Sequence, residues 1–442
     1  MIRMMDWRKY YEERTVSAEE AVRHIKSGDR VLLGHAIGTP EYLIQAMVAN
    51  ASSLKDVETV HMVGMGASPY CKEEMKDSFR HNSLFVGGRE RKAIAEGRGD
   101  YTPIYFSQIP NLFWSGALPV DVFMLQVSPP DNFGYVSLGV SVDYAVAAIN
   151  RAKCVIVEVN KYMPRTHGDS FIHVSKIHWF VQHDAPLIEV PMMQTTEVER
   201  AIGKNCASLV EDGATLQLGI GSLPDAVLEF LGEKNDLGIH SEMIADGAAL
   251  LMQKGVINNS RKTLHHGKTA VSFLMGTPIL YEYADDNPAF YMAPVDYIND
   301  PYVIAKNYKM VSINSCVQVD MMGQVCSEAI GLTQISAVGG QVDFVRGANL
   351  CPGGKAIIAM PSTARGGTVS KIVPFLDQGA CVTTSRCDVH YIVTEYGIAD
   401  MQGVTLRERS RRLIAIAHPD FRPMLIEEYE RRYHMAYRPI EE

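Results

Sequence analysis

The stretch GATLQLGIGSLPD at residues 213–225 has a counterpart in the stretch GDRVLLGHAIGTP at residues 28–40. In both stretches a glycine comes before a short apolar run, a second glycine ends that run, and a proline precedes an amphipathic segment. This order is typical of a β-strand that passes through a tight turn into a helix. The repeated unit of strand, turn and helix predicts an α/β fold with largely parallel sheets.

Short β-branched and apolar runs extend this pattern along the chain. Amphipathic helices are expected before the two stretches, at residues 18–26 and 197–210. In the first stretch, Thr39 is expected to cap a helix that starts at Pro40 and continues to Met47. Strands are expected at residues 30–33, 59–63, 122–127, 155–159, 215–218, 310–313, 356–360 and 391–394.

A second pair of similar stretches indicates that the chain has two related halves. The stretch DNFGYVS at residues 131–137 matches DMMGQVC at residues 320–326, at nearly the same offset as the first pair. Two matches in the same order and close register favour two halves of common architecture over chance. Because Pro186 and Pro191 interrupt the pattern, we expect an N-terminal α/β domain at residues 1–190 and a C-terminal α/β domain at residues 191–442.

Composition excludes several classes of protein. A hydrophobic content of 47% supplies a core and excludes a disordered or fibrous chain. The net charge of -9 provides no basic field, so neither nucleic acid nor an anionic membrane is expected as a partner. No uncharged apolar stretch approaches the roughly 18 residues of a membrane helix, and residues 1–15 lack the apolar core of a signal peptide. The eight cysteines contain no Cys-x-x-Cys pair, which is typical of a soluble cytoplasmic protein with reduced thiols.

Glycine-rich loops are candidate ligand sites. The loop from Gly219 to Leu223 would present backbone N–H groups and a helix N-terminus to an anion or an oxyanion. It lacks the third glycine of a dinucleotide fingerprint and the Gly-Lys-Ser/Thr of a P-loop. Further glycines at Gly339, Gly340 and residues 366–367 let the backbone adopt unusual dihedrals or approach a ligand closely. By these residues alone, each loop is either a ligand loop or an ordinary turn.

Glu242 is the strongest candidate for a reactive side chain. It follows the apolar run at residues 237–239 and is expected at a strand end, where open α/β sheets bind ligands. A carboxylate placed there acts as a nucleophile or a general base, or it only accepts backbone N–H bonds. The sequence has no Gly-x-Ser-x-Gly elbow, which argues against an α/β-hydrolase triad.

The histidines do not predict a metal site. After His173, spacings of five residues to His178 and His183 would spread them around a helix. No cysteine or carboxylate joins these three or His167 at ligand spacing. We therefore expect no metal.

Six segments, taken in order, give the chain a specific resemblance. They lie at residues 217–225, 240–247, 339–347, 361–367, 394–400 and 413–421. Together they are similar to the acetyl-CoA hydrolase/transferase family of CoA-transferases. The resemblance implies two similar open α/β domains with the active site at their interface. It also implies that Glu242 is the covalent catalytic residue, that Asn299 and Glu395 line the catalytic pocket, and that Gly340 lies on a mobile loop that closes over the thioester.

The resemblance also implies where coenzyme A binds. The implied contacts are Gly219, Ile220, Gly221, Ser222, Leu223, Ser336, Gly340 and Arg365. Ser336 stands where some relatives have Asn, and Arg365 stands where Lys is more usual. An arginine keeps the positive charge for a phosphate but differs from lysine in geometry.

The implied activity is transfer of CoA between an acyl-CoA, such as 4-hydroxybutyryl-CoA or butyryl-CoA, and a short-chain carboxylate such as acetate. It would proceed through a glutamyl-CoA thioester in a homodimer, with CoA as substrate and no permanently bound cofactor. Two alternatives remain at this point, an acyl-CoA hydrolase on the same fold and a non-catalytic metabolite-binding protein. The glutamate at position 242 argues against the second, and the incomplete glycine fingerprint argues against a nicotinamide dehydrogenase.

Overall fold

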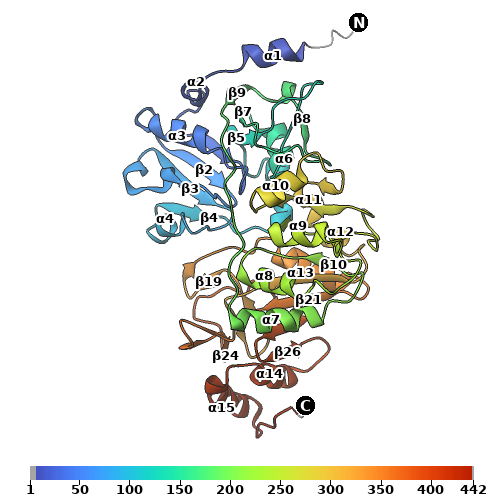
Figure 1. The fold of residues 1–442 in the computed structure, drawn as a ribbon. Coiled ribbons are helices and arrows are strands. Elements are labelled where there is room, and N and C mark those ends of the chain that lie inside the picture. The colour runs from blue at the N-terminus through green and yellow to red at the C-terminus, as the bar shows by residue number, and fades with distance from the viewer. Residues whose placement is uncertain (1–5, 441–442) are drawn as a thin grey trace. The chain divides into compact units, whose positions relative to one another are not determined.

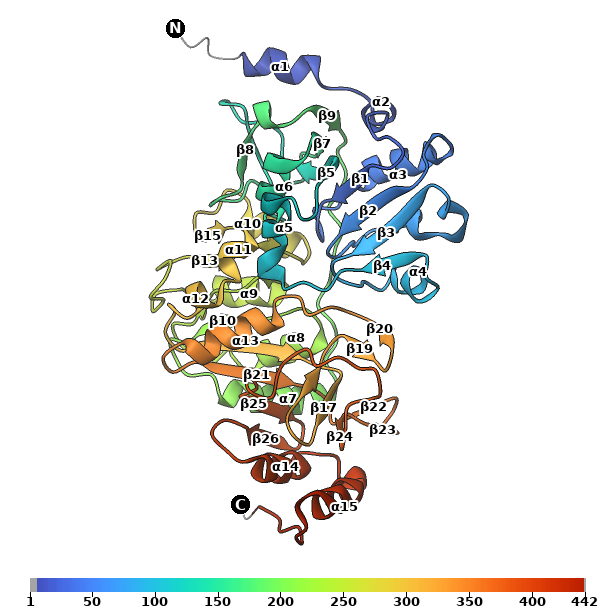
Figure 2. The same ribbon diagram turned by 180° about the vertical axis from the view of Figure 1, so that it is seen from behind.

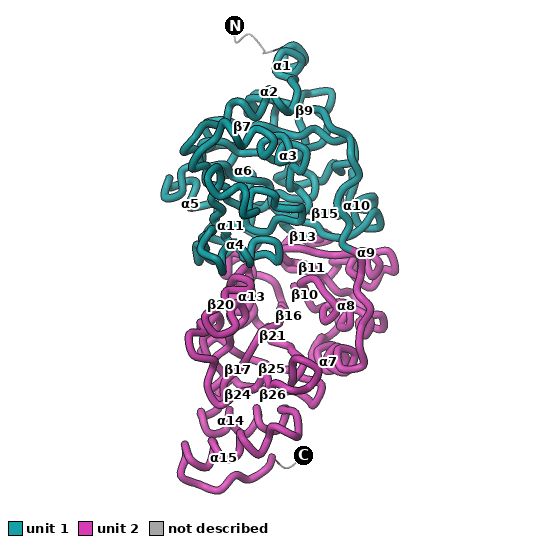
Figure 3. Tube along the Cα trace, turned by 90° about the vertical axis from the view of Figure 1, so that its left-hand side faces the viewer, with its two compact units in different colours: residues 1–190, 270–298 teal, residues 191–269, 299–442 magenta. Residues whose placement is uncertain are grey.

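The chain forms two compact units in the computed structural model, which describes residues 6–440. Unit 1 contains the residues up to Val190 together with residues 270–298 (Figure 3). Unit 2 contains residues 191–269 and the residues from Asn299 onward. The predicted ranges 1–190 and 191–442 place residues 270–298 differently, because no local sequence pattern marks a return of the chain to an earlier unit.

Unit 1 is built around a parallel sheet that has seven strands within the described residues, in the order β4-β3-β2-β1-β5-β7-β9. Its inner strand β5, which lies between β1 and β7, is buried along its whole length, as expected for a parallel sheet with both faces covered. The sheet strands are β1 (Arg30–Leu33), β2 (Val57–His61), β3 (Phe79–Ser83), β4 (Gly99–Tyr101), β5 (Val122–Val127), β7 (Cys154–Val159) and β9 (Trp179–Gln182).

The other elements of unit 1 are short helices and strand pairs (Figures 1 and 2). The helices are α1 (Trp7–Glu13), α2 (Ala18–Val22), α3 (Glu41–Ala49), α4 (Arg91–Ala95), α5 (Ile109–Ser115), α6 (Ala145–Arg151), α10 (Pro278–Ala284) and α11 (Val295–Ile298). The remaining strands are β6 (Tyr135–Ser137), β8 (Phe171–His173), β13 (Thr269–Val271), β14 (Phe273–Leu274) and β15 (Phe290–Met292).

The N-terminus of α3 differs from the prediction. Thr39 does not cap it, because its hydroxyl donates to the carbonyl oxygens of Ala36 at 2.7 Å and Gly34 at 3.2 Å. The second and third N–H groups of α3, at residues 42–43, instead donate to the buried carboxylate of Glu158, at 3.2 and 3.4 Å. The cap therefore comes from a strand far away in the sequence.

Unit 2 is built around a second sheet, with the order β11-β10-β16-β21-β25-β26. Its strands are parallel except for β26, which pairs antiparallel with β25 at one edge. Helices cover both faces, since α13 packs on β16 and β21 while α7 packs on β25 (Figures 1 and 2). The sheet strands are β10 (Thr215–Gln217), β11 (Gly238–Ile239), β16 (Met310–Ser315), β21 (Lys355–Ala359), β25 (Tyr391–Thr394) and β26 (Gly397–Asp400).

The helices of unit 2 are α7 (Glu197–Ser208), α8 (Ser222–Glu229), α9 (Asp246–Gln253), α12 (Pro301–Ile304), α13 (Gln341–Leu350), α14 (Leu406–Ala415) and α15 (Arg422–Tyr433). Its short strands are β12 (Met243–Ile244), β17 (Gln318–Asp320), β18 (Val325–Cys326), β19 (Ala329–Ile330), β20 (Thr333–Gln334), β22 (Thr363–Ala364), β23 (Val369–Ser370) and β24 (Ile372–Val373). Among the described residues, no helix combines the length and apolarity that a membrane span requires.

The two units share one strand order, which confirms the prediction of related halves. The order β2-β1-β5-β7-β9 in unit 1 corresponds to β11-β10-β16-β21-β25 in unit 2. In each set, the first strand in sequence lies between the second and the third. The two predicted repeats fall on β1 and β10, which are the corresponding first strands.

The second pair of similar stretches forms the same turn twice. Oδ1 of Asp131 accepts from the backbone N–H groups two and four residues later, at 2.8 and 2.9 Å. Oδ1 of Asp320 accepts the two equivalent bonds, both at 2.9 Å. Gly134 and Gly323 have φ values of 84° and 86°, a region that favours glycine. The sequence match therefore reflects one turn geometry in both halves.

Candidate active site

Glu242 lies just beyond the carboxyl end of β11. The backbone N–H of His240 donates to the carbonyl of Leu216 on β10 at 3.1 Å. The hydroxyl of Ser241 donates to the carbonyl of Leu218 at 3.2 Å. These bonds tie the segment to the end of the parallel sheet, the edge at which open α/β sheets bind ligands. The side chain of Glu242 is half-buried.

Asn299 fixes one oxygen of this carboxylate. Its Nδ2 donates to Oε2 of Glu242 at 2.9 Å, and the Asn299 residue is fully buried. A hydrogen bond to a carboxylate favours its charged form, which is the form that attacks a carbonyl. The structure thus brings together two of the residues that the sequence named for the catalytic pocket.

Gly340 completes the group. A Cβ atom at this position would lie 1.8 Å from Oε2 of Glu242 and 2.4 Å from Nδ2 of Asn299. Space therefore demands glycine at Gly340, whose φ is -94°, while the expected unusual dihedral lies at its neighbour Gly339, with a φ of 53°. Gly340 is also the N-cap of α13, so the carboxylate lies at the electropositive end of a helix.

Glu395 is held by a different partner. Its Oε2 accepts from the backbone N–H of Ser362 at 2.8 Å and its Oε1 accepts from the Ser362 hydroxyl at 2.6 Å. Burial lowers the pKa of the nearby Lys371, while the carboxylate of Glu395 acts in the opposite direction. Because Glu395 and Ser362 follow the adjacent strands β25 and β21, both lie at the carboxyl end of the sheet. The role of Glu395 in the catalytic pocket stays a prediction.

The glycine loop from Gly219 to Leu223 leads from the end of β10 into the first turn of α8. Gly221 is the N-cap of α8 with a φ of 108°, a conformation that favours glycine. The hydroxyl of Ser222 donates to the carboxylate of Glu199, which belongs to the capping box of α7. Ile220 is exposed. Since the Ser222 hydroxyl is already bonded, we expect this loop to offer its backbone rather than that hydroxyl to coenzyme A.

Two further implied contacts of coenzyme A, Ser336 and Arg365, lie elsewhere in unit 2. Ser336 is half-buried, and its backbone N–H donates to the carbonyl of Glu328 at 3.1 Å. Arg365 is exposed at the tip of the hairpin formed by β22 and β23, with a φ of 51°. No side chain of the described residues forms an ion pair with Arg365. A contact of either residue with coenzyme A stays a prediction.

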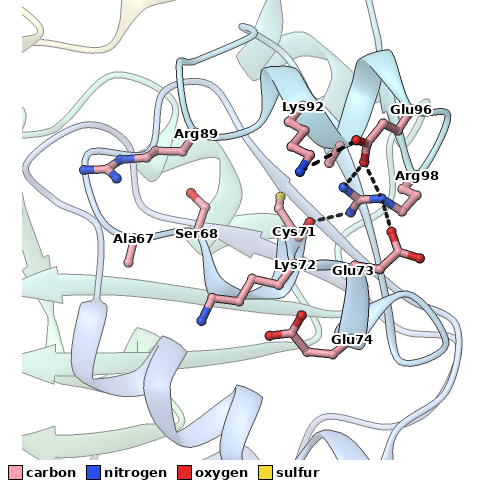
Figure 4. Close-up of a pocket in the computed structure, with 11 residues that line it drawn as sticks. Ala67, Ser68, Cys71, Lys72, Glu73, Glu74, Arg89, Lys92, Glu96 and Arg98 are labelled. Carbon is pink, nitrogen blue, oxygen red and sulfur yellow. Dashed lines mark hydrogen bonds and ion pairs between the residues drawn. The ribbon is translucent and has the colours of Figure 1, made fainter.

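A separate pocket of about 440 Å³ lies in unit 1 (Figure 4). Arg98 forms ion pairs there with Glu73 at 2.9 Å and with Glu96 at 2.5 Å. Lys92 also pairs with Glu96, at 3.8 Å, as the dashed lines in Figure 4 mark. Two of the four cationic side chains that line this pocket, Lys92 and Arg98, are therefore paired with carboxylates of its own lining.

Within the described residues, no three His, Cys, Asp or Glu side chains are grouped so that they could hold a metal ion. The expected helical arrangement of the histidines is wrong, because His173 ends β8 and His178 immediately precedes β9. All eight cysteines are free thiols. Most are buried, as expected for residues within apolar runs, and only Cys387 is exposed.

Comparisons with known proteins cover nearly the whole chain. The N-terminal domain of the acetyl-CoA hydrolase/transferase family matches residues 1–192, and its C-terminal domain matches residues 276–429. A 4-hydroxybutyrate coenzyme A transferase of Clostridium kluyveri is 59% identical over 97% of this chain and 100% of its own length. A butyryl-CoA:acetate CoA-transferase of Anaerostipes caccae is 38% identical over 97% of this chain and 98% of its own length.

Solved structures are also similar to this chain over nearly its whole length. RipA from Yersinia pestis has a TM-score of 0.93 and 41% identity, covering 97% of this chain and 100% of that chain. A 4-hydroxybutyrate CoA-transferase from Porphyromonas gingivalis has a TM-score of 0.83 and 43% identity with the same coverage.

Proposed function

The chain belongs to the acetyl-CoA hydrolase/transferase family and is a CoA-transferase, and we propose that Glu242 carries its CoA as a thioester. The observation that supports this role is the fixed carboxylate of Glu242, bonded to the buried Asn299 and lying against Gly340. The proposed substrates are 4-hydroxybutyryl-CoA or butyryl-CoA as donor and a short-chain carboxylate such as acetate as acceptor. CoA acts here as a substrate and not as a bound cofactor.

The reaction begins with attack of the Glu242 carboxylate on the carbonyl carbon of the acyl-CoA. The carbon–sulfur bond breaks, which gives an acyl-glutamyl anhydride and CoA thiolate. The thiolate then attacks the glutamyl carbonyl carbon and expels the acyl group as a carboxylate, leaving glutamyl-CoA. The incoming acid reverses these steps, so the thioester energy passes to a new acid without ATP.

The neighbours of Glu242 suit the charges that develop. In the glutamyl tetrahedral intermediates the negative charge lies on a side-chain oxygen of residue 242, and Nδ2 of Asn299 already donates to Oε2. A donor fixed before the reaction stabilises such an oxyanion without reorganisation. The N-terminus of α13 at Gly340 adds a favourable electrostatic potential.

Acid dependence tests this proposal directly. Butyryl-CoA incubated with acetate should give acetyl-CoA and butyrate in equal amounts, whereas butyryl-CoA alone should persist after the first enzyme equivalent. Rapid loss of thioester without acetate would instead indicate a hydrolase, because water would then reach the intermediate. A panel of acyl-CoA donors and acids would identify the preferred pair. The predicted position of the site between the two domains and the predicted homodimer stay proposals.

A further inference from the structure

The strand that leads to Glu242 lies at an edge of its sheet. β11 pairs with β10 on one side only. The backbone N–H groups of Gly238 and His240 donate to the carbonyls of Ala214, just before β10, and of Leu216 on β10, at 2.9 and 3.1 Å. The intervening Ile239 therefore points its N–H and carbonyl away from the sheet, and a buried edge needs other partners for them.

Two side chains supply those partners. The N–H of Ile239 donates to Oδ1 of Asn259 at 2.9 Å. Its carbonyl accepts from Nζ of Lys262 at 2.6 Å. An amide oxygen and an amine thus take the place of the next strand at this one residue, three positions before Glu242.

Lys262 is buried in an unusual setting for a lysine, with only 4% of its surface exposed. Its Nζ also donates to the carbonyl of Lys268 at 2.7 Å, and no carboxylate of the described residues forms an ion pair with it. Burial lowers the pKa of Lys262 to about 7. Two carbonyl acceptors match the two N–H donors of a neutral amine, so Lys262 keeps both hydrogen bonds in either protonation state.

Gly238 makes room for this lysine. A Cβ atom at Gly238 would lie 2.5 Å from Cγ and 2.9 Å from Cδ of Lys262. The side-chain stem therefore runs directly against the backbone of β11, and its amine reaches over the strand to the next carbonyl.

We propose that Lys262 is a positioning residue for Glu242, because it fixes the outer edge of β11 at Ile239 and so the path of the chain into the nucleophile. The inference rests on the proposed function, since it assigns a role toward the covalent residue. The bonds of His240 and Ser241 to the sheet restrict the backbone between Ile239 and Glu242. A shift of the Ile239 carbonyl would move the carboxylate, and a misplacement of about 1 Å can cost about 100-fold in rate.

The test separates misplacement from loss of folded protein. Lys262→Met keeps the apolar stem but removes Nζ. The rate is divided by the number of sites that form the glutamyl-CoA thioester. We expect this kcat per site to fall about tenfold or more, and the KM for butyryl-CoA to change less than twofold. A purely structural role would lower the number of active sites and leave kcat per site unchanged. Lys254→Met, at an exposed lysine of the same unit, serves as the matched control and should behave as wild type.

Gly238→Ala provides a second variant, in which Nζ is present but the stem is displaced by the new Cβ. It should reproduce the fall in kcat, and the double variant with Lys262→Met should be no worse than the more affected single variant. Unchanged kcat per site in Lys262→Met, while the wild type forms the Glu242 thioester, overturns this inference alone. Absence of that thioester in the wild type overturns the proposed function and this inference together.

Discussion

Nδ2 of Asn299 donates to Oε2 of Glu242 across 2.9 Å, although the two residues are 57 positions apart in the sequence. Residues 270–298 between them belong to unit 1, whereas Glu242 and Asn299 both belong to unit 2. The chain thus leaves unit 2 and returns at the residue that bonds the nucleophile.

Loss of the Asn299 amide should slow thioester formation. Asn299→Ala leaves the buried side of the carboxylate without its donor, and a hydrogen bond to a charged group contributes about 1.5 to 3 kcal/mol. We expect about a tenfold to hundredfold fall in the single-turnover rate with butyryl-CoA. An equal rate would remove Asn299 from the mechanism.

Asn299→Asp should act through charge instead. A second carboxylate beside Glu242 disfavours its ionised form and raises its pKa. The acidic limb of the pH–rate profile of the variant should therefore move to higher pH. A profile that coincides with that of the wild type would show that residue 299 does not contact the reacting carboxylate.

Gly340→Ala should abolish most of the transfer activity while the protein remains folded. The new Cβ would overlap Oε2 of Glu242, so the carboxylate must leave its position. Gly232→Ala is a matched control, because a Cβ there meets no atom within 4 Å. Steady-state rates and thermal melting of both variants check the prediction, and comparable activity of the two would contradict it.

Arg365→Ala should raise the apparent KM for acyl-CoA about tenfold and leave the KM for acetate unchanged. Its guanidinium is exposed, so it is free to pair with a phosphate of CoA, which a charge-assisted bond stabilises. Lys at this position should restore part of the affinity. Arg407→Ala, at another exposed arginine of unit 2, is the control. An unaltered acyl-CoA dependence in Arg365→Ala would leave this residue without a role.

Lys262 should make stability depend on pH. Its pKa of about 7 in the folded protein lies below the ordinary lysine value of 10.5, so the folded state binds fewer protons than the unfolded state between these values. The free energy of unfolding should therefore rise with pH from about 7 relative to Lys262→Met. Urea denaturation of both proteins at pH 7 and 9.5 tests this, and a constant difference between them would argue against a depressed pKa.

The sequence predicted what local patterns encode. All eight expected strands are present, with ends that differ by two residues or fewer, because short apolar runs between glycines are a local signal. The paired turns at Asp131 and Asp320 were visible for the same reason. The residues alone predict Glu242 as a carboxylate at a strand end, and the family resemblance implies its covalent role.

The features that the sequence missed depend on contacts between distant segments. The carboxylate of Glu158 that caps α3 lies on β7, and nothing near Thr39 reveals it. Lys262 lies in the stretch SRKTLHH at residues 260–266. This polar composition is typical of a solvent-exposed loop. In the structure Lys262 is buried, and its Nζ donates to the carbonyl of Ile239, a contact with a segment more than 20 residues earlier.

Mapping the covalent intermediate tests the central claim most directly. The wild-type protein is incubated with butyryl-CoA without an acceptor acid, digested under mildly acidic conditions, and analysed by mass spectrometry. The account predicts a CoA thioester on the peptide that carries Glu242, and no adduct in Glu242→Ala, whose transfer rate should fall by roughly a factor of 10⁶. An adduct on another residue, or full transfer activity in the alanine variant, would contradict it.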